Sequence, residues 1–357
     1  MYPVMDTSAP ISFTTDTFSS KGVDPIDENT LPIQNFGVYG YWVPSSDDFG
    51  SAHKDNLYIN NIKAVKGEDS IWRGETVCYW PVMQNVCFFA YAPYFKSDLA
   101  EAASPDAFNF QFPLETFSDE GMPRGTFTQS GNVVSQVDLC LGKPQVLNAS
   151  IGAVPIQLEH ALCNLKFYIR INGAQKEGTE YKVEELQING LLASNSFSFR
   201  RNPAEGEMPF VWDTPAGDAS YSASCQLTNY SSPSHISSGS YIKYSSGEAT
   251  ASNSTLINDQ INGQLYLLPQ MLTENANLII TLAMYKKNNA SDTYSKISSI
   301  HPITVSLSGK EWKPGQTVSY YLTMGLSGGE YYIDTAITVR MEDWKNSVYV
   351  HEEETIE

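Results

Sequence analysis

A serine between glycines, in "GLSGG" at residues 325–329, matches the G-x-S-x-G pattern of hydrolase nucleophiles, with Ser327 at its centre. Such a nucleophile needs a strand before it and a helix after it, because the helix N-terminus helps to build the oxyanion site. Here the strand-like run "YYIDTAITV" follows. The pattern therefore favours a Gly-rich hairpin turn, and a hydrolase that uses Ser327 stays as an alternative.

Metal-ligating residue types are present but scattered along the chain. Among five histidines only His160 has a potential co-ligand close in sequence, Cys163, and the five cysteines show no C-x-x-C or zinc-ligand spacing. His160 lies on the apolar side of its predicted strand, which indicates a core histidine hydrogen-bonded to backbone. Acidic pairs such as Asp47-Asp48 are typical of solvated surface. We therefore expect no catalytic residue, no metal site, no cofactor and no enzymatic activity.

Length and charge limit the remaining classes. At about 150 residues per domain, a chain of 357 residues predicts two domains. Its net charge of −18 argues against nucleic acid or an anionic membrane surface as a partner, because both repel a polyanion. No run of 18 or more apolar residues is present, so the sequence predicts no transmembrane segment.

Strand signals dominate the elements that must position any site. Short runs rich in Val, Ile, Phe and Tyr alternate with Gly, Pro, Asn and Ser clusters, which predicts an all-β protein. The most aromatic of them is "YWPVMQNVCFFAYAP" at 79–93, expected to be a hairpin with its aromatic side chains in a core. Cys78 and Cys87 flank its turn, and a disulfide between them is left open.

A break in "GKPQVLNASIGA" predicts the domain junction, giving domains 1–148 and 149–357. In the second, "VPIQLEHALCNLKFYIRI" alternates with a phase shift near Cys163 and Asn164, which indicates a β-bulge or one helical turn. A serine-rich insert, at about 213–260, is expected to be surface loop or hairpin rather than core. Before the junction, alternation in "VSQVDLCL" puts Asp138 and Cys140 on a mostly polar face that is expected to meet water.

Five segments in order resemble the fimbrillin family of Bacteroidales, the Mfa-like (type V) pilins and related surface lipoproteins. They are "YWPVMQNVCFFAYAP", "VPIQLEHALCNLKFYI", "GQLYLLPQ", "EWKPGQTVSYYLTM" and "ITVRMEDW", and the resemblance runs from about Ile11 to Trp344. It implies two tandem transthyretin-like β-sandwich domains, with structural roles for the motif residues Trp80, Pro81, Phe89, Tyr91, His160, Pro269, Trp312, Gly315 and Trp344.

The resemblance implies a structural or adhesive subunit of a surface pilus (fimbria), exported as a lipoprotein precursor with a lipid anchor to the outer membrane. Family pilins lose an N-terminal strand to a protease and accept a strand from the next subunit, so the partners are other pilin subunits. Here the removable strand would lie in "ISFTTDTF", with Ile11, Phe13 and Phe18 pointing inward. Lys21 is the basic residue in the loop that follows, since the first arginine is Arg73. A tip or accessory role is an alternative to the shaft, and 331–350 is a candidate donor segment.

A second hypothesis is a glycan-binding surface module. Exposed aromatic side chains in "GYWVPSSDDFGS" could stack on sugar rings of a host or bacterial surface ligand, and Trp42 is the candidate contact. A protein ligand for the same surface is equally compatible with the sequence.

Overall fold

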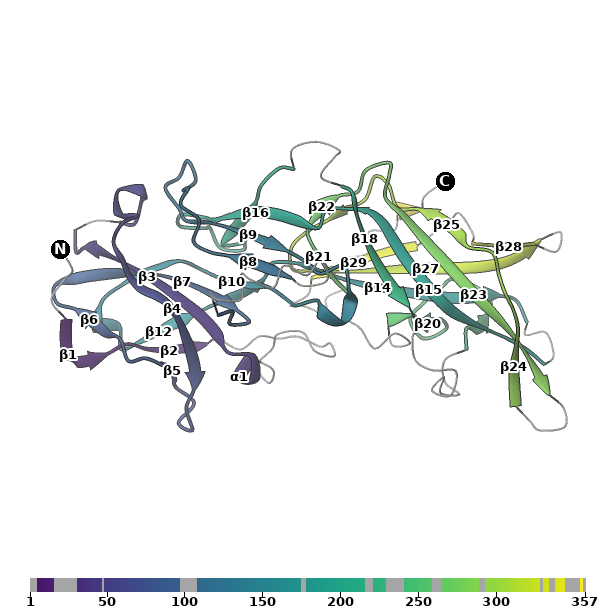
Figure 1. Ribbon diagram of the computed structural model, residues 1–357, viewed down its shortest axis with the longest axis horizontal. Coiled ribbons are helices and arrows are strands. Elements are labelled where there is room, and N and C mark those ends of the chain that lie inside the picture. Colours follow the sequence, from purple (N-terminus) through teal and green to yellow (C-terminus); the bar gives the residue numbers. More distant parts are fainter. Residues whose placement is uncertain are drawn as a thin grey trace. The chain divides into compact units, whose positions relative to one another are not determined.

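The computed structural model (Figure 1) describes residues 5–15, 31–46, 48–96, 108–174, 178–215, 221–228, 241–258, 265–288, 293–327, 330–333, 338–343 and 354–355. These residues form strands almost throughout, which confirms the all-β class. The helical elements described are α1 (Leu31–Gln34) and single 3-10 turns at Ser51–His53, Val133–Ser135 and Ala149–Ile151. Within the described chain no helix has the length and apolar character to cross a membrane.

The chain divides into two compact units that are not consecutive halves. Unit 1 comprises Met1–Gln129, Val137–Leu162 and Ser194–Pro215, and unit 2 comprises Ser130–Gln136, Cys163–Ala193 and Ala216–Glu357. Residues 149–162, which the Gly-Pro-Asn-Ser break assigns to a second domain, thus lie in unit 1. The phase shift near Cys163 is the point where the chain passes from unit 1 to unit 2, because β13 (Leu158–His160) ends there and β14 (Cys163–Asn172) begins.

Unit 1 is built on one sheet of nine described strands. Its order is β12 (Ala153–Ile156), β2 (Ser12–Thr15), β5 (Trp72–Gly74), β4 (Leu57–Lys66), β3 (Phe36–Pro44), β7 (Gln84–Ala92), β10 (Cys140–Gly142) and β13, with β11 (Gln145–Leu147) also paired to β7. Two smaller sheets complete the unit: β1 (Met5–Pro10) with β6 (Tyr79–Pro81), and β17 (Phe210–Trp212), β16 (Ser194–Phe199), β9 (Arg124–Thr128) and β8 (Asn109–Gln111).

Strand β7, the second run of the aromatic segment at 79–93, is buried on both faces. The first run, β6, pairs with β1 and not with β7, so the expected hairpin is not formed. On one face Phe88 packs edge-to-face with Phe13 and Trp80, at ring-centroid distances of 6.1 and 5.6 Å. On the other face Phe89 packs against Tyr41 at 5.8 Å and Phe199 of β16 at 5.1 Å. Adjacent residues of a strand point to opposite faces. The two consecutive phenylalanines therefore belong to two separate core layers.

Unit 2 is a sandwich of two sheets. The first contains β19 (Lys243–Ser245), β14, β27 (Gln316–Ser327), β29 (Thr338–Asp343) and β30 (Glu354–Thr355), with β20 (Thr255–Leu256) and β21 (Leu265–Leu267) on β14 and β28 (Glu330–Ile333) on β27. The second contains β18 (Ala223–Thr228), β15 (Thr179–Leu191), β23 (Asn277–Asn288) and β24 (Thr293–Ser299), with β25 (Ile303–Ser306) on β23. Alternate residues of β14, β27, β15 and β23 fill the core between the sheets. A separate pair joins β22 (Gln270–Met271) to β26 (Glu311–Trp312).

The described parts of the serine-rich insert contribute to this sandwich. Strand β18 pairs with β15, and β19 and β20 pair with β14. Cys225, Ile242 and Ile257 are buried in the core of unit 2. The expectation of a surface segment is therefore wrong for these strands, because isolated apolar residues between serines are enough to anchor short strands.

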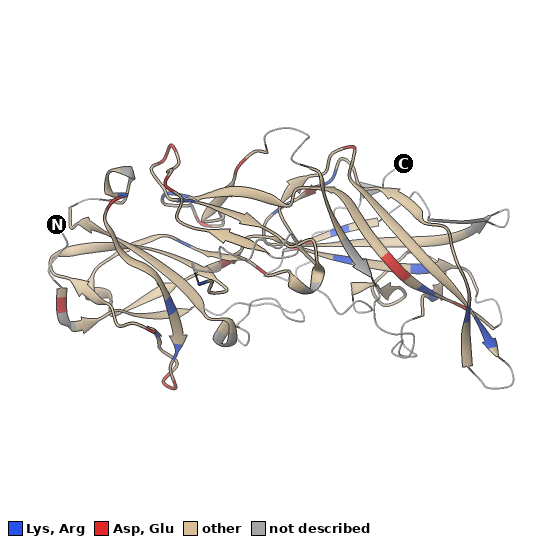
Figure 2. Cartoon of the chain, in the orientation of Figure 1, with Lys and Arg blue, Asp and Glu red and all other residues tan. Residues whose placement is uncertain are grey.

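Charged residues lie mainly at turns and strand ends, while most of the strand length carries none (Figure 2). One example is the β4–β5 turn, where both guanidinium nitrogens of Arg73 bind the Asp69 carboxylate at 2.9 and 2.7 Å. These hydrogen bonds lower the pKa of Asp69 to about 2. Both side chains are about half exposed, so we assign this pair little stabilising energy.

Gly37 makes room for the buried ring of Tyr91 on the neighbouring strand. The two residues pair across β3 and β7, and a Cβ on Gly37 would lie 2.3 Å from the Tyr91 ring. That ring cannot move easily, since its hydroxyl lies 2.6 Å from Asn61 Oδ1 and accepts a hydrogen bond from Phe95 N–H at 3.3 Å.

We expect Gly37→Ala to lower the free energy of unfolding by about 1–3 kcal/mol, as overpacking in a core does. Gly50→Ala is the control, because a Cβ there meets no atom within 4 Å, and its effect should stay within about 0.5 kcal/mol. Urea unfolding of both variants measures the difference. Equal stabilities would show that Tyr91 is not fixed against Gly37.

Candidate functional site

The N-terminal segment of unit 1 lies inside the sheet rather than along its edge. Strand β2 is inserted between β12 and β5, so both sides of its backbone are paired. It runs parallel to β12, with Val154 opposite Phe13, and antiparallel to β5, with Trp72 opposite Phe13. The preceding strand β1 pairs antiparallel with β6. Removal of β2 would therefore leave β12 and β5 with unpaired backbone groups that face each other across a gap.

Side chains of this segment fill the core below the gap. Ile11 and Phe13 are 4% and 2% exposed, whereas Thr14 points outward. The Phe13 ring meets Phe36 at 5.9 Å and Phe88 at 6.1 Å, both edge-to-face. This agrees with the inward orientation expected for both residues. The alternating pattern makes the segment a strand with one apolar face that closes the core.

Two hydrogen bonds outside the sheet pairing also hold the segment. Ile11 N–H donates to the carbonyl of Cys78 at 2.8 Å, and Trp72 Nε1–H donates to Thr15 Oγ1 at 3.2 Å. Cys78 itself is half buried and, like Cys87, is a free thiol, so the two do not form a disulfide. Burial raises the pKa of the Cys78 thiol, which keeps it protonated at neutral pH.

Two residues expected to take part in strand removal, Phe18 and Lys21, lie outside the described residues. The motif residue Trp344 lies outside them too. Arg73 is in β5, where its backbone pairs with Ser12 of β2 and Val65 of β4. A protease needs an extended, unpaired backbone, and Arg73 in this state does not offer one.

The candidate donor segment is paired within its own unit where it is described. Strand β28 pairs with β27 from Ser327 opposite Glu330 to Met324 opposite Ile333, and β29 pairs with β27 further along. The strand that follows Ser327 is not the helix that a nucleophile elbow requires, so this geometry does not support the hydrolase alternative.

A family model described as fimbrillin-like matches residues 32–344, which is most of the chain. The chain belongs to the fimbrillin-like family. This agrees with the resemblance in the five sequence segments. No curated protein matches the sequence significantly.

Among solved structures, a fimbrial protein from Bacteroides vulgatus ATCC 8482 is similar to this fimbrillin-like chain. The TM-score is 0.62 at 21% identity, with 94% of this chain and 99% of that chain covered. A protein named for cell adhesion from Bacteroides uniformis ATCC 8492 gives a TM-score of 0.41 at 14% identity, covering 94% and 99%. At these identities the first match supports the fold, and the second adds no argument.

The motif residues of this fimbrillin-like chain are distributed over both units. In unit 1, Trp80 and Pro81 lie in β6, Phe89 and Tyr91 in β7, and His160 in β13; in unit 2, Pro269 lies between β21 and β22, Trp312 in β26, and Gly315 before β27. Trp312 is buried and its Nε1–H donates to the Tyr320 hydroxyl at 2.8 Å. Gly315 has a φ of 69°, which favours glycine at the corner before β27. Local packing and backbone conformation thus explain the residue types at 312 and 315.

The surroundings of His160 differ from those predicted. Cys163, its neighbour in sequence, belongs to unit 2, where its Sγ donates to the carbonyl of Lys313 at 3.0 Å. His160 instead contacts Asp138 and Cys140, which are 4% and 0% exposed. The expectation of a water-facing polar surface in "VSQVDLCL" is thus wrong for both residues. Strand β10 lies between β7 and β13, and the sheet is covered there.

Phe13 should contribute more stability than any other residue of β2. We expect Phe13→Ala to lower the free energy of unfolding of unit 1 by about 3–5 kcal/mol. Thr14→Ala, on the outward face of the same strand, should change it by about 0.5 kcal/mol or less. Urea unfolding followed by tryptophan fluorescence reports on this region through Trp72 and Trp80. If the two variants behave alike, β2 does not close the core.

Proposed function

We propose that this chain is a structural or adhesive subunit of a cell-surface pilus, and that β2 is a removable strand whose place is taken by a strand of another subunit. Family membership supports a pilus or adhesion role. The observation that carries the exchange step is the position of β2 between β12 and β5 with Ile11 and Phe13 buried beneath it. Export as a lipoprotein precursor to the outer membrane belongs to the same proposal.

The energetics favour replacement of β2 over its simple loss. Burying a side chain the size of Ile or Phe contributes about 1.5–3 kcal/mol, so Ile11 and Phe13 together contribute several kcal/mol. That is a large share of the total stability of about 5–15 kcal/mol of a typical domain. A unit without β2 also has two unpaired strand edges, which readily accept an extended segment. The incoming strand must supply apolar side chains at alternate positions to fill the places of Ile11 and Phe13.

Proteolysis between β2 and α1 is the step that would release the strand. Lys21 is the basic residue of that connection, and Arg73 is held within β5. Cleavage after Lys21 would separate β1 and β2 from the rest of the chain without cutting any described strand. Residues 331–350 of another subunit are our candidate for the incoming strand. A tip or accessory subunit would keep β2 and use the same fold without exchange.

Limited trypsin digestion of the folded protein tests the exchange. We expect loss of residues 1–21, identified by mass spectrometry, and a ladder of detergent-resistant species on gels of unboiled samples. Lys21→Gln is the matched control and should give neither the shortened chain nor the ladder. Cleavage after Lys21 without a ladder would contradict strand exchange and support the tip or accessory role.

A glycan-binding module is the second candidate, and the position of Trp42 supports it. Trp42 is half buried in β3, and its buried sequence neighbours Tyr41 and Val43 point to the opposite face of the strand. Its backbone N–H donates to the Asn56 carbonyl at 3.0 Å, and Asn56 Nδ2–H donates to its carbonyl at 3.1 Å. The ring is thus presented from a fixed backbone, as a stacking platform for a sugar requires.

Glycan-array binding tests this candidate. We expect any glycan signal of the wild-type protein to be lost in Trp42→Ala, with the circular dichroism spectrum unchanged. Met83→Ala is the control. Met83 is 85% exposed in the β6–β7 turn, so its substitution removes apolar surface at another place on the protein. Failure of the wild-type protein to bind any glycan would end this hypothesis and leave the pilus role untouched.

A further inference from the structure

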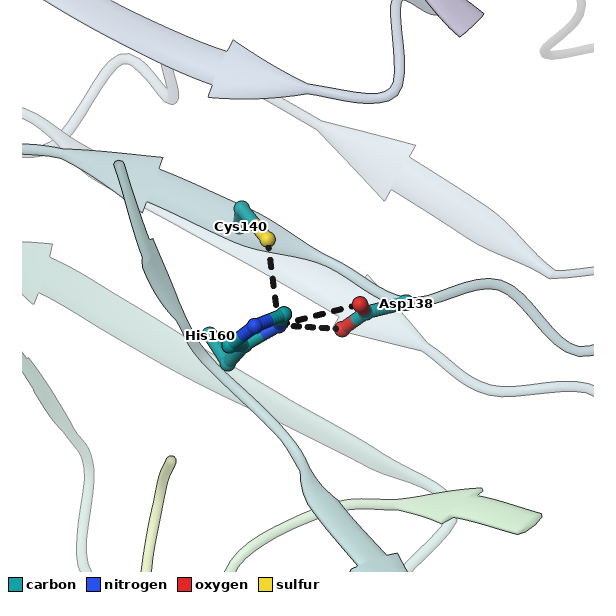
Figure 3. Close-up of side chains that lie close together, drawn as sticks. All are labelled: Asp138, Cys140 and His160. Atoms are coloured by element: carbon teal, nitrogen blue, oxygen red, sulfur yellow. Dashed lines mark hydrogen bonds and ion pairs between the residues drawn. The ribbon is translucent and has the colours of Figure 1, made fainter. Parts of the chain in front are cut away.

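Three side chains with metal-binding atoms converge in the core of unit 1. Cys140 of β10 and His160 of β13 are directly opposite each other in the antiparallel pairing, and Asp138 precedes Cys140 by two residues. In Figure 3 the Asp138 carboxylate and the Cys140 sulfur both point to the same edge of the His160 ring. Among the described His, Cys, Asp and Glu residues, this is the group of three whose potential ligand atoms all lie within 4.8 Å of one another.

The distances place the ligand atoms around one point. His160 Nδ1 lies 3.0 Å from Asp138 Oδ2, 3.1 Å from Oδ1 and 3.4 Å from Cys140 Sγ. All three residues offer ligand atoms within 4.8 Å of one another. The side chains of His160 and Asp138 are each 2% exposed, and Cys140 is fully buried. The Cys140 sulfur is therefore not presented at the surface, as the nucleophile of a Cys-His-Asp triad usually is.

One nitrogen, Nδ1, serves both partners of the histidine. It lies within hydrogen-bonding distance of the Asp138 carboxylate and of the Cys140 sulfur. A cation between the three groups accepts a lone pair from each at the same time. A bound cation would also favour the deprotonated form of the Cys140 thiol, which is the form that ligates a metal.

The ligand types indicate which cation fits. Thiolate and imidazole exclude Mg²⁺ and Ca²⁺, which take oxygen ligands. Zn²⁺ binds Cys sulfur at about 2.3 Å and His nitrogen and carboxylate oxygen at about 2.0–2.2 Å, in tetrahedral geometry. Tetrahedral angles at those lengths separate N from O by about 3.3 Å and N from S by about 3.6 Å. The observed Nδ1–O and Nδ1–Sγ separations are slightly shorter than these values, and the Asp138 and Cys140 ligand atoms lie within 4.8 Å of each other.

We propose that Asp138, Cys140 and His160 bind a Zn²⁺ ion that ties β10 to β13. Three protein ligands leave the fourth coordination position to a water molecule or another donor atom. The ion would fix the end of β13 immediately before the chain passes into unit 2 at Cys163. The site would stabilise the pairing of β10 with β13.

The test uses the full chain, purified without chelator. We expect about one zinc per chain by elemental analysis. After unfolding in chelator, refolding with Zn²⁺ should raise the melting temperature relative to refolding with chelator present. Refolding with Co²⁺ should give a thiolate-to-metal charge-transfer band that Zn²⁺ abolishes by competition.

Two cysteine variants identify the ligand. Cys140→Ser should lose the charge-transfer band and weaken metal binding by at least about 10- to 100-fold. That is the loss caused by mutating a residue that only hydrogen-bonds to a metal ligand, and loss of the ligand itself should cost no less. Cys163→Ser, close to His160 only in sequence, should keep the band. The proposal is overturned if the wild-type protein contains no metal and shows neither a band nor a metal-dependent melting shift. Loss of the band in Cys163→Ser but not in Cys140→Ser would also overturn it.

Discussion

Unit 1 depends on a strand that has no solvent-facing side. Strand β7 pairs with β3, β10 and β11, and both of its faces are covered by aromatic residues. Phe88 supports the layer that β2 closes, and Phe89 supports the layer shared with β16. Such a strand reads as a continuous apolar run, which explains the concentration of large side chains in "VCFFAYA". A polar substitution at either position would disrupt one layer and leave the other without its backing.

The sequence was informative where alternation alone determines the outcome. The strand class and the inward direction of Ile11 and Phe13 follow from local periodicity and are present in the structure. The hairpin expected at 79–93 is not formed, because β6 pairs with β1 and β7 pairs with β3, β10 and β11. Periodicity cannot tell which sheet a strand joins, so it did not show that β16 and β17 return to unit 1 or that β13 and β14 belong to different units. The Asp138 and Cys140 prediction failed for a related reason. A polar-apolar alternation predicts water on one face, but β10 is an inner strand whose pairing with β13 brings His160 opposite Cys140.

Strand β2 is connected to the Asp138–Cys140–His160 cluster through its parallel partner β12. Strand β12, which forms one wall of the β2 position, is separated from β13 by a single residue, Gln157. The carbonyl of Gln157 accepts a hydrogen bond from Lys143 N–H at 2.9 Å. A cross-link at His160 would therefore hold β13, and through it β12, while β2 is absent. In the proposed strand exchange, β12 and β5 must keep their positions while the place of β2 is empty.

The parallel pairing of β2 with β12 also has a consequence for the order of folding. Ser12 and Ala153 are partners although about 140 residues separate them, and contacts this distant in sequence form late because a long loop must first be closed. During synthesis the first strand emerges long before its neighbour exists. The β2–β12 pairing can therefore form only after residues 153–156 have been made, whereas the other neighbour of β2, strand β5, follows it by only about 60 residues. The two edges of β2 thus close at different stages of synthesis.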